Sequence, residues 1–322
     1  MNGFSLDPRQ LVVRSPLTPP VVARRLLGQS LGDAVRGKAV LITGASSGIG
    51  RAAAVKIGDA GGEVVLVART RGKLDEVAAD IRRAGGVAHV HPCDLSDLED
   101  IDRMADEVLE QRGRVDILVN NAGRSIRRSI ALSYDRFHDF ERTMQLNYFG
   151  PVRLILRVLP GMRERRSGHV VNISSVSVQT GPPRFAAYMA SKAALDAFSD
   201  SVNPEVAADG VQFTTIYMPL VRTPMIGPTE AYDRFPTLTP DEAADLIAEA
   251  ITRRPRRISS RLGNYGELTR TLSPGSMDAI ASTAYRLFPD SRAARGETGE
   301  GGPERPSRAG RLFANLFRGG EW

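Results

Sequence analysis

The chain has 322 residues, of which 42% are hydrophobic and 25% charged, a composition typical of a globular protein and not of a disordered or fibrous one. The formal net charge of +6 comes from arginines that are scattered among acidic residues, so the charge gives no reason to expect a nucleic-acid partner. A single cysteine, Cys93, excludes an intrachain disulfide and a multi-cysteine metal site.

Hydropathy and the spacing of the histidines argue against a membrane-spanning, secreted or metal-binding protein. No apolar run approaches the roughly 20 residues that a transmembrane helix needs, and the N-terminus lacks the apolar core of a secretory signal. We therefore expect a cytoplasmic protein with no transmembrane segment, and peripheral contact with a membrane stays open. Of the four histidines only His89 and His91 are close in sequence, so no metal site is expected.

Residues 1–36 are expected to form an N-terminal extension outside the main domain. Three prolines, Pro16, Pro19 and Pro20, precede a short stretch in which Leu27, Leu31 and Val35 recur at helical spacing. This pattern predicts a short amphipathic helix.

Residues 37–260 alternate between strand-like and helix-like patterns. The strand-like segments are apolar and rich in β-branched residues, and they are separated by segments of helical periodicity. They lie at 38–43, 63–68, 87–90, 115–119, 169–173 and 211–217. This order predicts an α/β fold, a Rossmann-type doubly wound parallel sheet with helices on both faces.

Two further segments with helical periodicity, 240–252 and 275–287, follow the last strand-like run. Residues 261–290 are interpreted as a helical C-terminal extension. Its stripe of apolar residues at 277–287 could cover an apolar substrate or pack on a second subunit. Residues 291–322 are interpreted as a mostly disordered tail, since 291–310 is rich in Gly, Pro, Ser and charge, with an apolar end.

The first strand-like run leads into a glycine-rich turn and then a helical segment. Such a turn puts backbone N–H groups and a helix N-terminus against a pyrophosphate, with glycine where a Cβ would collide. The residues expected to bind the cofactor here are Gly44, Ser46, Ser47, Gly48, Ile49 and Gly50.

The residue after the second strand favours NADPH as the cofactor. An NAD-specific site would place a carboxylate there, but this chain has Arg69, whose guanidinium can pair with a 2′-phosphate. Asp94 and Leu95 follow the third strand, where Asp94 could accept a hydrogen bond from the adenine amino group. A helix-capping role for Asp94 is the alternative.

Tyr188 and Lys192 lie four residues apart in a helical run and so share one face. A phenol has an ordinary pKa near 10, and a neighbouring ammonium stabilises its phenolate. This pair alone is weak evidence for a catalytic site. Asn147, the run Asn121, Ala122 and Gly123, and Ser175 are the polar residues that accompany it after the fourth and fifth strands and in the helix between them.

With these motifs, residues 37–260 resemble the short-chain dehydrogenase/reductase family. In that family a serine stands thirteen places before the tyrosine, which is the position of Ser175. The resemblance implies that Ser175 bonds the substrate carbonyl oxygen and that Tyr188 passes the proton. It also implies that Lys192 holds the ribose hydroxyls and that Asn147 fixes a water. A homo-oligomer is expected for the same reason.

The segment after the sixth strand departs from the family pattern. Where the family has Pro-Gly, this chain has Pro219-Leu220, which places apolar bulk beside the nicotinamide. Val221 and Thr223 are still expected to reach the carboxamide.

A narrower resemblance covers nearly the whole chain. Residues 121–128, 135–150 and 218–226 resemble the bacterial long-chain fatty acyl-CoA reductases of wax-ester synthesis. This resemblance implies reduction of an acyl-CoA thioester to the fatty aldehyde with NADPH. An alcohol or ketone dehydrogenase or 3-oxoacyl reductase stays as the second hypothesis, and a protein that only senses NADPH as the third.

Four arginines are candidates for binding the phosphates of CoA. Arg124, Arg127 and Arg128 follow the fourth strand and so emerge at the carboxyl edge of the sheet, where ligands of open α/β folds bind. Arg184 lies between Ser175 and Tyr188. A solvated basic loop is the alternative to a phosphate site.

Overall fold

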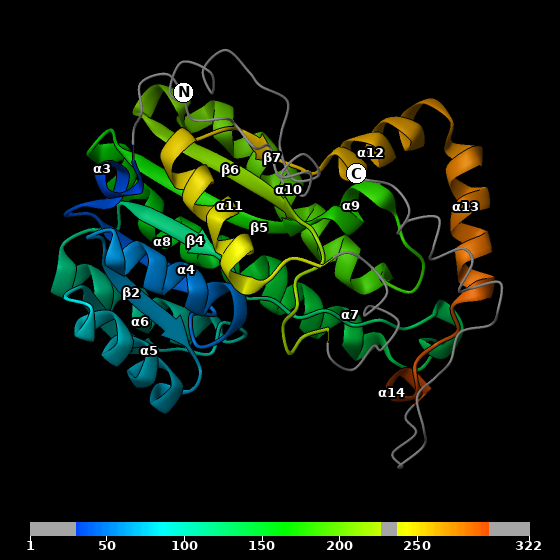
Figure 1. The fold of residues 1–322 in the computed structure, drawn as a ribbon, viewed down its shortest axis with the longest axis horizontal. Helices are drawn as coiled ribbons and strands as arrows, with labels where there is room; N and C mark the ends of the chain where they lie inside the picture. The colour runs from blue at the N-terminus through cyan, green and yellow to red at the C-terminus, as the bar shows by residue number, and fades with distance from the viewer. Residues whose placement is uncertain (1–29, 227–236, 296–322) are drawn as a thin grey trace, which may run out of the picture.

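The computed structural model describes residues 30–226 and 237–295. These residues form a seven-stranded parallel sheet in the order β3-β2-β1-β4-β5-β6-β7, which confirms the doubly wound α/β fold (Figure 1). The strands are β1 (Ala39–Thr43), β2 (Glu63–Ala68), β3 (Val87–Pro92), β4 (Ile117–Asn120), β5 (Gly168–Ser175), β6 (Val211–Met218) and β7 (Arg257–Ile258).

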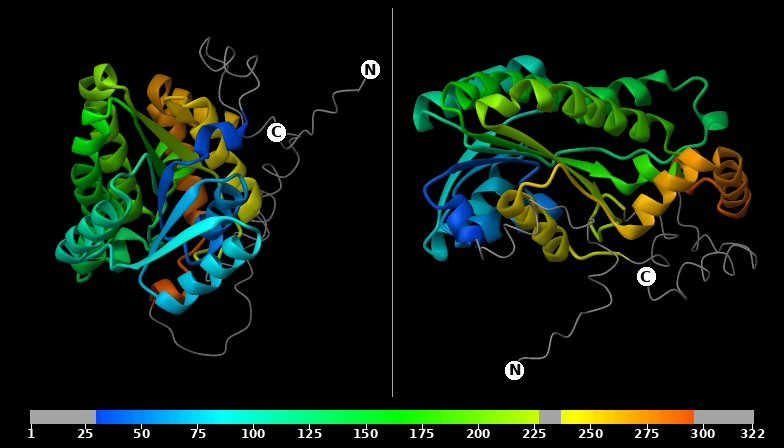
Figure 2. Two further views of the ribbon diagram at one scale, coloured as in Figure 1. Left: turned by 90° about the vertical axis from the view of Figure 1, so that its left-hand side faces the viewer. Right: turned by 90° about the horizontal axis from the view of Figure 1, so that it is seen from above.

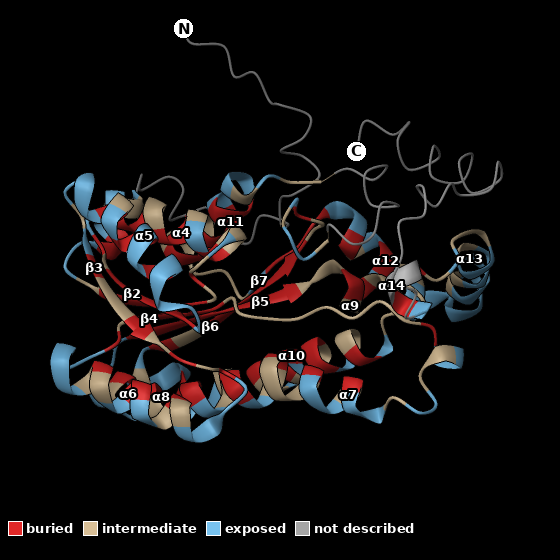
Figure 3. Cartoon of the chain, turned by 90° about the horizontal axis from the view of Figure 1, so that it is seen from below, coloured by how far each residue is buried: buried red, intermediate tan, exposed pale blue. Residues whose placement is uncertain are grey.

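Helices cover both faces of the sheet, so β1 is buried at every position, as a strand between two helical layers must be (Figures 2 and 3). One layer consists of α3 (Leu31–Val35), α4 (Gly48–Asp59), α5 (Arg71–Arg83) and α11 (Pro240–Arg253). The other consists of α6 (Leu98–Arg112), α7 (Phe137–Met144), the π-helical turn η2 (Gln145–Phe149), α8 (Gly150–Glu164) and α10 (Ala186–Val206). The order of the strands reverses between β1 and β4, which lie side by side: β2 and β3 extend from β1, and β5, β6 and β7 extend from β4. Folds of this kind bind their ligands at this switch point, beyond the carboxyl ends of the strands.

Five of the remaining elements gather at one end of the sheet: η1 (Ile130–Leu132), α9 (Val176–Thr180), α12 (Arg261–Leu272), α13 (Pro274–Leu287) and α14 (Arg292–Arg295). The short η3 (Ala207–Asp209) lies at the opposite end, where it leads from α10 into β6. Helix α12 contacts α9, and α13 stands beside α12 away from the sheet (Figure 1). No residue of α13 is fully buried.

Three segments differ from the expectation. Strand β7 has only two residues and no sequence pattern to predict it. Residues 31–35 form α3, with Ala34 and Val35 inside the core, so the end of the predicted N-terminal extension belongs to the domain. The predicted disordered tail begins with a helical turn, α14, where Ser291 and Ala294 are buried.

The described residues set two further limits. Within 30–226 and 237–295, none of the helices combines the length and apolarity that crossing a bilayer requires. The same residues contain no group of three His, Cys, Asp or Glu side chains arranged for a metal ion. Leu27 and the apolar end of the tail lie outside the described residues.

Candidate active site

The glycine-rich turn joins β1 to α4 and leaves no room for side chains. A Cβ on Gly50 would lie 2.3 Å from the carbonyl oxygen of Gly44, so a larger residue would force the turn open. Gly44 and Gly48 have φ values of 67° and 52°, which favour glycine. The side chain of Ser47, the N-cap of α4, accepts no hydrogen bond from any described residue of the first turn. The turn and helix end therefore fit a dinucleotide pyrophosphate.

The segment after β6 lies against this turn. Thr223 Cγ2 is 3.1 Å from the position that a Cβ on Gly48 would take, and Val221 is buried. Val221 forms a β-bridge with Leu238, and the N–H of Leu238 donates to the carbonyl of Leu220 at 2.8 Å. Pro219 and Leu220 are half-buried. The residues predicted to contact the nicotinamide therefore lie beside the turn that is predicted to hold the pyrophosphate.

Arg69 follows β2 directly, and its side chain is exposed at the carboxyl edge of the sheet. Asp94 is half-buried and accepts a hydrogen bond from the Ser96 N–H at 2.9 Å through Oδ1. The cap of α6 is Asp97, so the capping alternative for Asp94 is wrong. Leu95 is buried.

The segment after β4 is fixed to the end of β1. The N–H groups of Asn121 and Ala122 both donate to Thr43 Oγ1 at 3.0 Å, and Asn121 Nδ2 donates to the carbonyl of Thr43 at 2.9 Å. A Cβ on Gly123 would lie 3.2 Å from Asn147 Oδ1 and 3.3 Å from Lys192 Nζ. Gly123 therefore lets the predicted catalytic asparagine and lysine approach the same backbone.

Ser175 and Tyr188 come from β5 and α10. Ser175 is the N-cap of α9, and its hydroxyl accepts hydrogen bonds from the N–H and the hydroxyl of Ser177. Tyr188 is half-buried in the first turn of α10. Burial raises the pKa of the Tyr188 phenol, and a hydrogen bond with the Ser175 side chain opposes this rise. The two hydroxyls are thus placed to act on one carbonyl oxygen.

Lys192 is buried one turn after Tyr188, and its Nζ donates to the carbonyl of Ile173 at 2.7 Å. Burial lowers its pKa to about 8, and a nearby carboxylate, Asp196, acts in the opposite direction. Asn147 is fully buried in η2. Its side chain accepts from the N–H of Arg124 and donates to the Arg124 carbonyl and to Ser191 Oγ.

Asp196 is the residue that the sequence interpretation missed. Ser174 Oγ donates to Asp196 Oδ2 at 2.9 Å, and Asp196 Oδ1 is buried with no hydrogen-bond partner among the described residues. Burial raises the pKa of Asp196 to about 6. Its position four residues after Lys192 on the same helix was the available signal.

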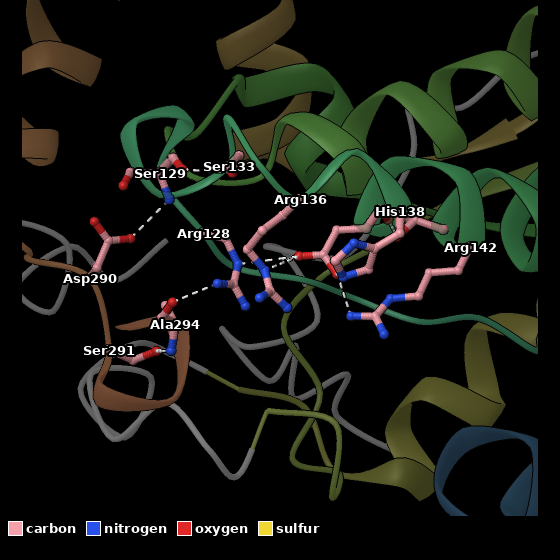
Figure 4. Close-up of polar contacts among 11 residues, drawn as sticks. Arg128, Ser129, Ser133, Arg136, His138, Arg142, Asp290, Ser291 and Ala294 are labelled. Carbon is pink, nitrogen blue, oxygen red and sulfur yellow. Dashed lines mark hydrogen bonds and ion pairs between the residues drawn. The ribbon is translucent and has the colours of Figure 1, made fainter. Parts of the chain in front are cut away.

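Three of the four predicted CoA arginines contact the C-terminal extension. Arg127 donates to the carbonyls of Phe288 and Pro289, and Arg128 donates to the carbonyl of Ala294 at 2.7 Å (Figure 4). These contacts hold residues 288–294 against the segment after β4.

Arg184 completes this attachment. Its Nε lies 3.2 Å from Asp290 Oδ1, its guanidinium stacks over the Tyr285 ring at 4.0 Å, and it donates to the Tyr285 carbonyl. Asp290 also accepts from the N–H of Ser129 (Figure 4). We call these contacts of Arg127, Arg128, Arg184 and Asp290 the arginine clamp. Phosphate binding by Arg124, Arg127, Arg128 and Arg184 stays a prediction.

Cys93 is buried at the end of β3. Burial raises the pKa of its thiol to about 12, so the thiolate is not available as a nucleophile near neutral pH.

Comparison with known proteins places these residues in a family. The sequence model of the short chain dehydrogenase family matches residues 38–233. An uncharacterised oxidoreductase of Mycobacterium tuberculosis is 56% identical over 310 residues, 94% of this chain and 91% of that protein. A fatty acyl-CoA reductase of Acinetobacter baylyi is 51% identical over 288 residues, 89% of this chain and 96% of that protein. A metagenomic short-chain oxidoreductase solved with NADP is 31% identical, with a TM-score of 0.60 over 70% of this chain and 97% of that one.

Proposed function

Since the chain belongs to the short-chain dehydrogenase family and is an oxidoreductase, we propose that it reduces a long-chain fatty acyl-CoA to the fatty aldehyde with NADPH. The observation that carries the proposal is the similarity to the Acinetobacter baylyi fatty acyl-CoA reductase, which extends over nearly the full length of both chains. The residues predicted for catalysis, Asn147, Ser175, Tyr188 and Lys192, are all present.

The residues around the crevice fit NADPH. The turn Gly44–Gly50 would hold its pyrophosphate, Arg69 its 2′-phosphate and Lys192 its nicotinamide ribose. When bound, NADPH would supply a hydride to the thioester carbonyl carbon. The NADP complex of the metagenomic relative supports this choice of cofactor.

The protein's own residues would handle the charge that develops on the carbonyl oxygen. The hydroxyls of Ser175 and Tyr188 converge on that oxygen and stabilise its negative charge by hydrogen bonds. Tyr188 passes its proton to the oxygen, and the Lys192 ammonium one turn later stabilises the phenolate that this leaves. The hydroxyl of the tetrahedral hemithioacetal then returns its proton to the Tyr188 phenolate as the CoA thiolate leaves, which gives the aldehyde. No enzyme thiol is needed, which agrees with the buried, protonated Cys93.

The stoichiometry of the reaction tests the proposal. Purified protein is mixed with palmitoyl-CoA and NADPH, and loss of NADPH, free thiol and aldehyde are measured together. One thiol and one aldehyde for each NADPH oxidised is the expected result. Oxidation of NADPH without thiol release, or turnover of a ketone or 3-oxoacyl thioester only, would replace the proposal by the ketone-reductase alternative.

A further inference from the structure

Three arginines and one histidine surround one buried carboxylate at the start of α7. Arg128 Nε and Arg136 Nε lie 3.3 and 3.2 Å from Asp139 Oδ2, and His138 Nε2 lies 3.4 Å from Oδ1 (Figure 4). Arg142 also pairs with Oδ1. The Asp139 side chain is only 3% exposed.

The charges in this group do not balance. Burial favours the neutral form of Asp139, but its bonds with the surrounding guanidiniums outweigh that effect and keep its pKa below the usual value, so it is ionised. Three guanidiniums face this single negative charge, and no second carboxylate among the described residues forms an ion pair with them. Two positive charges are therefore in excess.

Three side chains of this group are partly exposed to solvent. Arg128 is largely buried, at 15% exposure, and pairs with Asp139 while it belongs to the arginine clamp. Arg136, His138 and Arg142 are 36%, 52% and 47% exposed, so their polar ends can reach a ligand from solvent. We call these three residues the α7 cation face, whose positive charge comes from Arg136 and Arg142.

The α7 cation face lies next to the catalytic helix. A small pocket between α7 and the start of α10 is lined by Arg128, Asp139 and Ala187, and Ala187 immediately precedes Tyr188. The apolar side chains of Ile126, Ile130 and Phe140 also line it, together with Ser133, Arg184 and Ala186. A ligand with an apolar part at this pocket and an anionic part at the exposed side of α7 would match this surface.

We propose that the α7 cation face binds the phosphate groups of the CoA carrier, while Arg127, Arg128 and Arg184 hold the C-terminal extension. A guanidinium group can bind a phosphate through two parallel hydrogen bonds. The assignment rests on the proposed function. It makes Arg136, His138 and Arg142 the phosphate ligands in place of the arginines of the clamp.

Binding of free CoA tests the site without turnover. The Arg136→Ala/Arg142→Ala variant should bind CoA, titrated by calorimetry in saturating NADP⁺, at least about tenfold more weakly than the wild type. The affinity of the variant should also depend less on salt. Binding of pantetheine, which has no phosphate, should not change. Arg163→Ala, which removes an exposed arginine paired with Asp209, is the matched control and should bind CoA normally.

Two further variants guard against misfolding. Arg136→Lys/Arg142→Lys keeps the charge and should recover part of the affinity, and Arg142→Ala alone leaves Arg128 and Arg136 on Asp139. Equal CoA affinity in the wild type and the double alanine variant would overturn the site and leave the proposed function standing. Weaker CoA binding in the variant, with no reduction of palmitoyl-CoA by the wild type, would overturn the function and keep the site. Loss of binding to an acidic acyl carrier protein, with CoA affinity unchanged, would assign the face to that protein instead.

Discussion

Ser174 Oγ donates a hydrogen bond of 2.9 Å to Asp196 Oδ2, which joins the end of β5 to α10 one turn after Lys192. Asparagine at position 196 keeps the size and an acceptor for Ser174 but removes the negative charge. The charge raises the pKa of Lys192, so Asp196→Asn should lower that pKa further.

The high-pH limb of the rate of reduction reports this change. With Asp196→Asn we expect the limb to move to lower pH by roughly one unit, because the Lys192 ammonium is lost earlier. Asp200→Asn, one turn further along α10 and half-exposed, is the control and should leave the limb in place. An unchanged limb in both variants would show that Asp196 has no electrostatic part in catalysis.

The same substitution should change how stability depends on pH. Asp196 has a pKa of about 6 in the folded protein against an ordinary 3.8, so the folded state binds its proton more tightly than the unfolded state. The stabilisation from this group is therefore complete below about pH 4 and is lost as the pH rises through 6. Relative to the wild type, Asp196→Asn should gain on the order of 2 kcal/mol in unfolding free energy between pH 4.5 and 7.5. Urea unfolding at both pH values measures the difference, and a constant offset would contradict the shifted pKa.

Tyr188 is the proposed proton donor. Tyr188→Phe should lower kcat by at least about 10²-fold with little change in the affinity for NADPH. Tyr265→Phe, in an exposed tyrosine on α12, should leave kcat unchanged. Single-turnover oxidation of NADPH measures the chemical step, and near-normal turnover by Tyr188→Phe would exclude the proposed proton donor.

Arg69 should decide between the two nicotinamide cofactors. Arg69→Asp replaces a partner of the 2′-phosphate by an acceptor for the ribose hydroxyl and a charge that repels the phosphate. The preference, measured as the ratio of kcat/KM for NADPH and NADH, should reverse toward NADH. Arg163→Asp, a charge reversal in the last turn of α8, should keep the NADPH preference. If both variants keep it, Arg69 does not contact the cofactor.

The arginine clamp should affect stability and the recognition of long acyl chains. Asp290→Ala leaves Arg184, whose side chain is 5% exposed, without its carboxylate, and we expect a loss of about 3 kcal/mol in unfolding free energy. If the C-terminal extension covers the acyl chain, the KM for palmitoyl-CoA should rise more than the KM for butyryl-CoA. Asp278→Ala, in an exposed residue of α13, is the control. Equal changes in both KM values would favour packing on a second subunit.

The parallel strands of the sheet could be predicted from sequence because a strand between two helical layers must be apolar at nearly every position, as in β1 and β2. The two residues of β7 have no such run, and Arg257 within it is exposed. Helix α14 lies in a segment whose composition favours disorder, and its structure depends on contacts such as that between Arg128 and Ala294, 166 positions apart. Local patterns carry no information about such contacts.

The glycine-rich turn could be placed from sequence because it joins the first strand to the first long helix, and Tyr188 and Lys192 because residues four apart share a helix face. Ser175 was predicted only from the family resemblance. Asp196 follows the same helical spacing, but a carboxylate on a helix is usually solvated, and only its burial at 7% exposure distinguishes it. The arginines after β4 were correctly placed at the carboxyl edge, but the sequence did not reveal that Asp290 and the carbonyls of Phe288, Pro289 and Ala294 would engage them.

Because Cys93 is buried, the folded protein should not react with reagents that detect free thiols. It is the only cysteine of the chain, it is 2% exposed, and its thiol stays protonated at the pH of an assay. A chromogenic disulfide should therefore react with CoA as it is released and not with the folded enzyme. Product formation can then be followed continuously at high enzyme concentration, and a slow, delayed reaction with the protein itself would report unfolding during the same experiment.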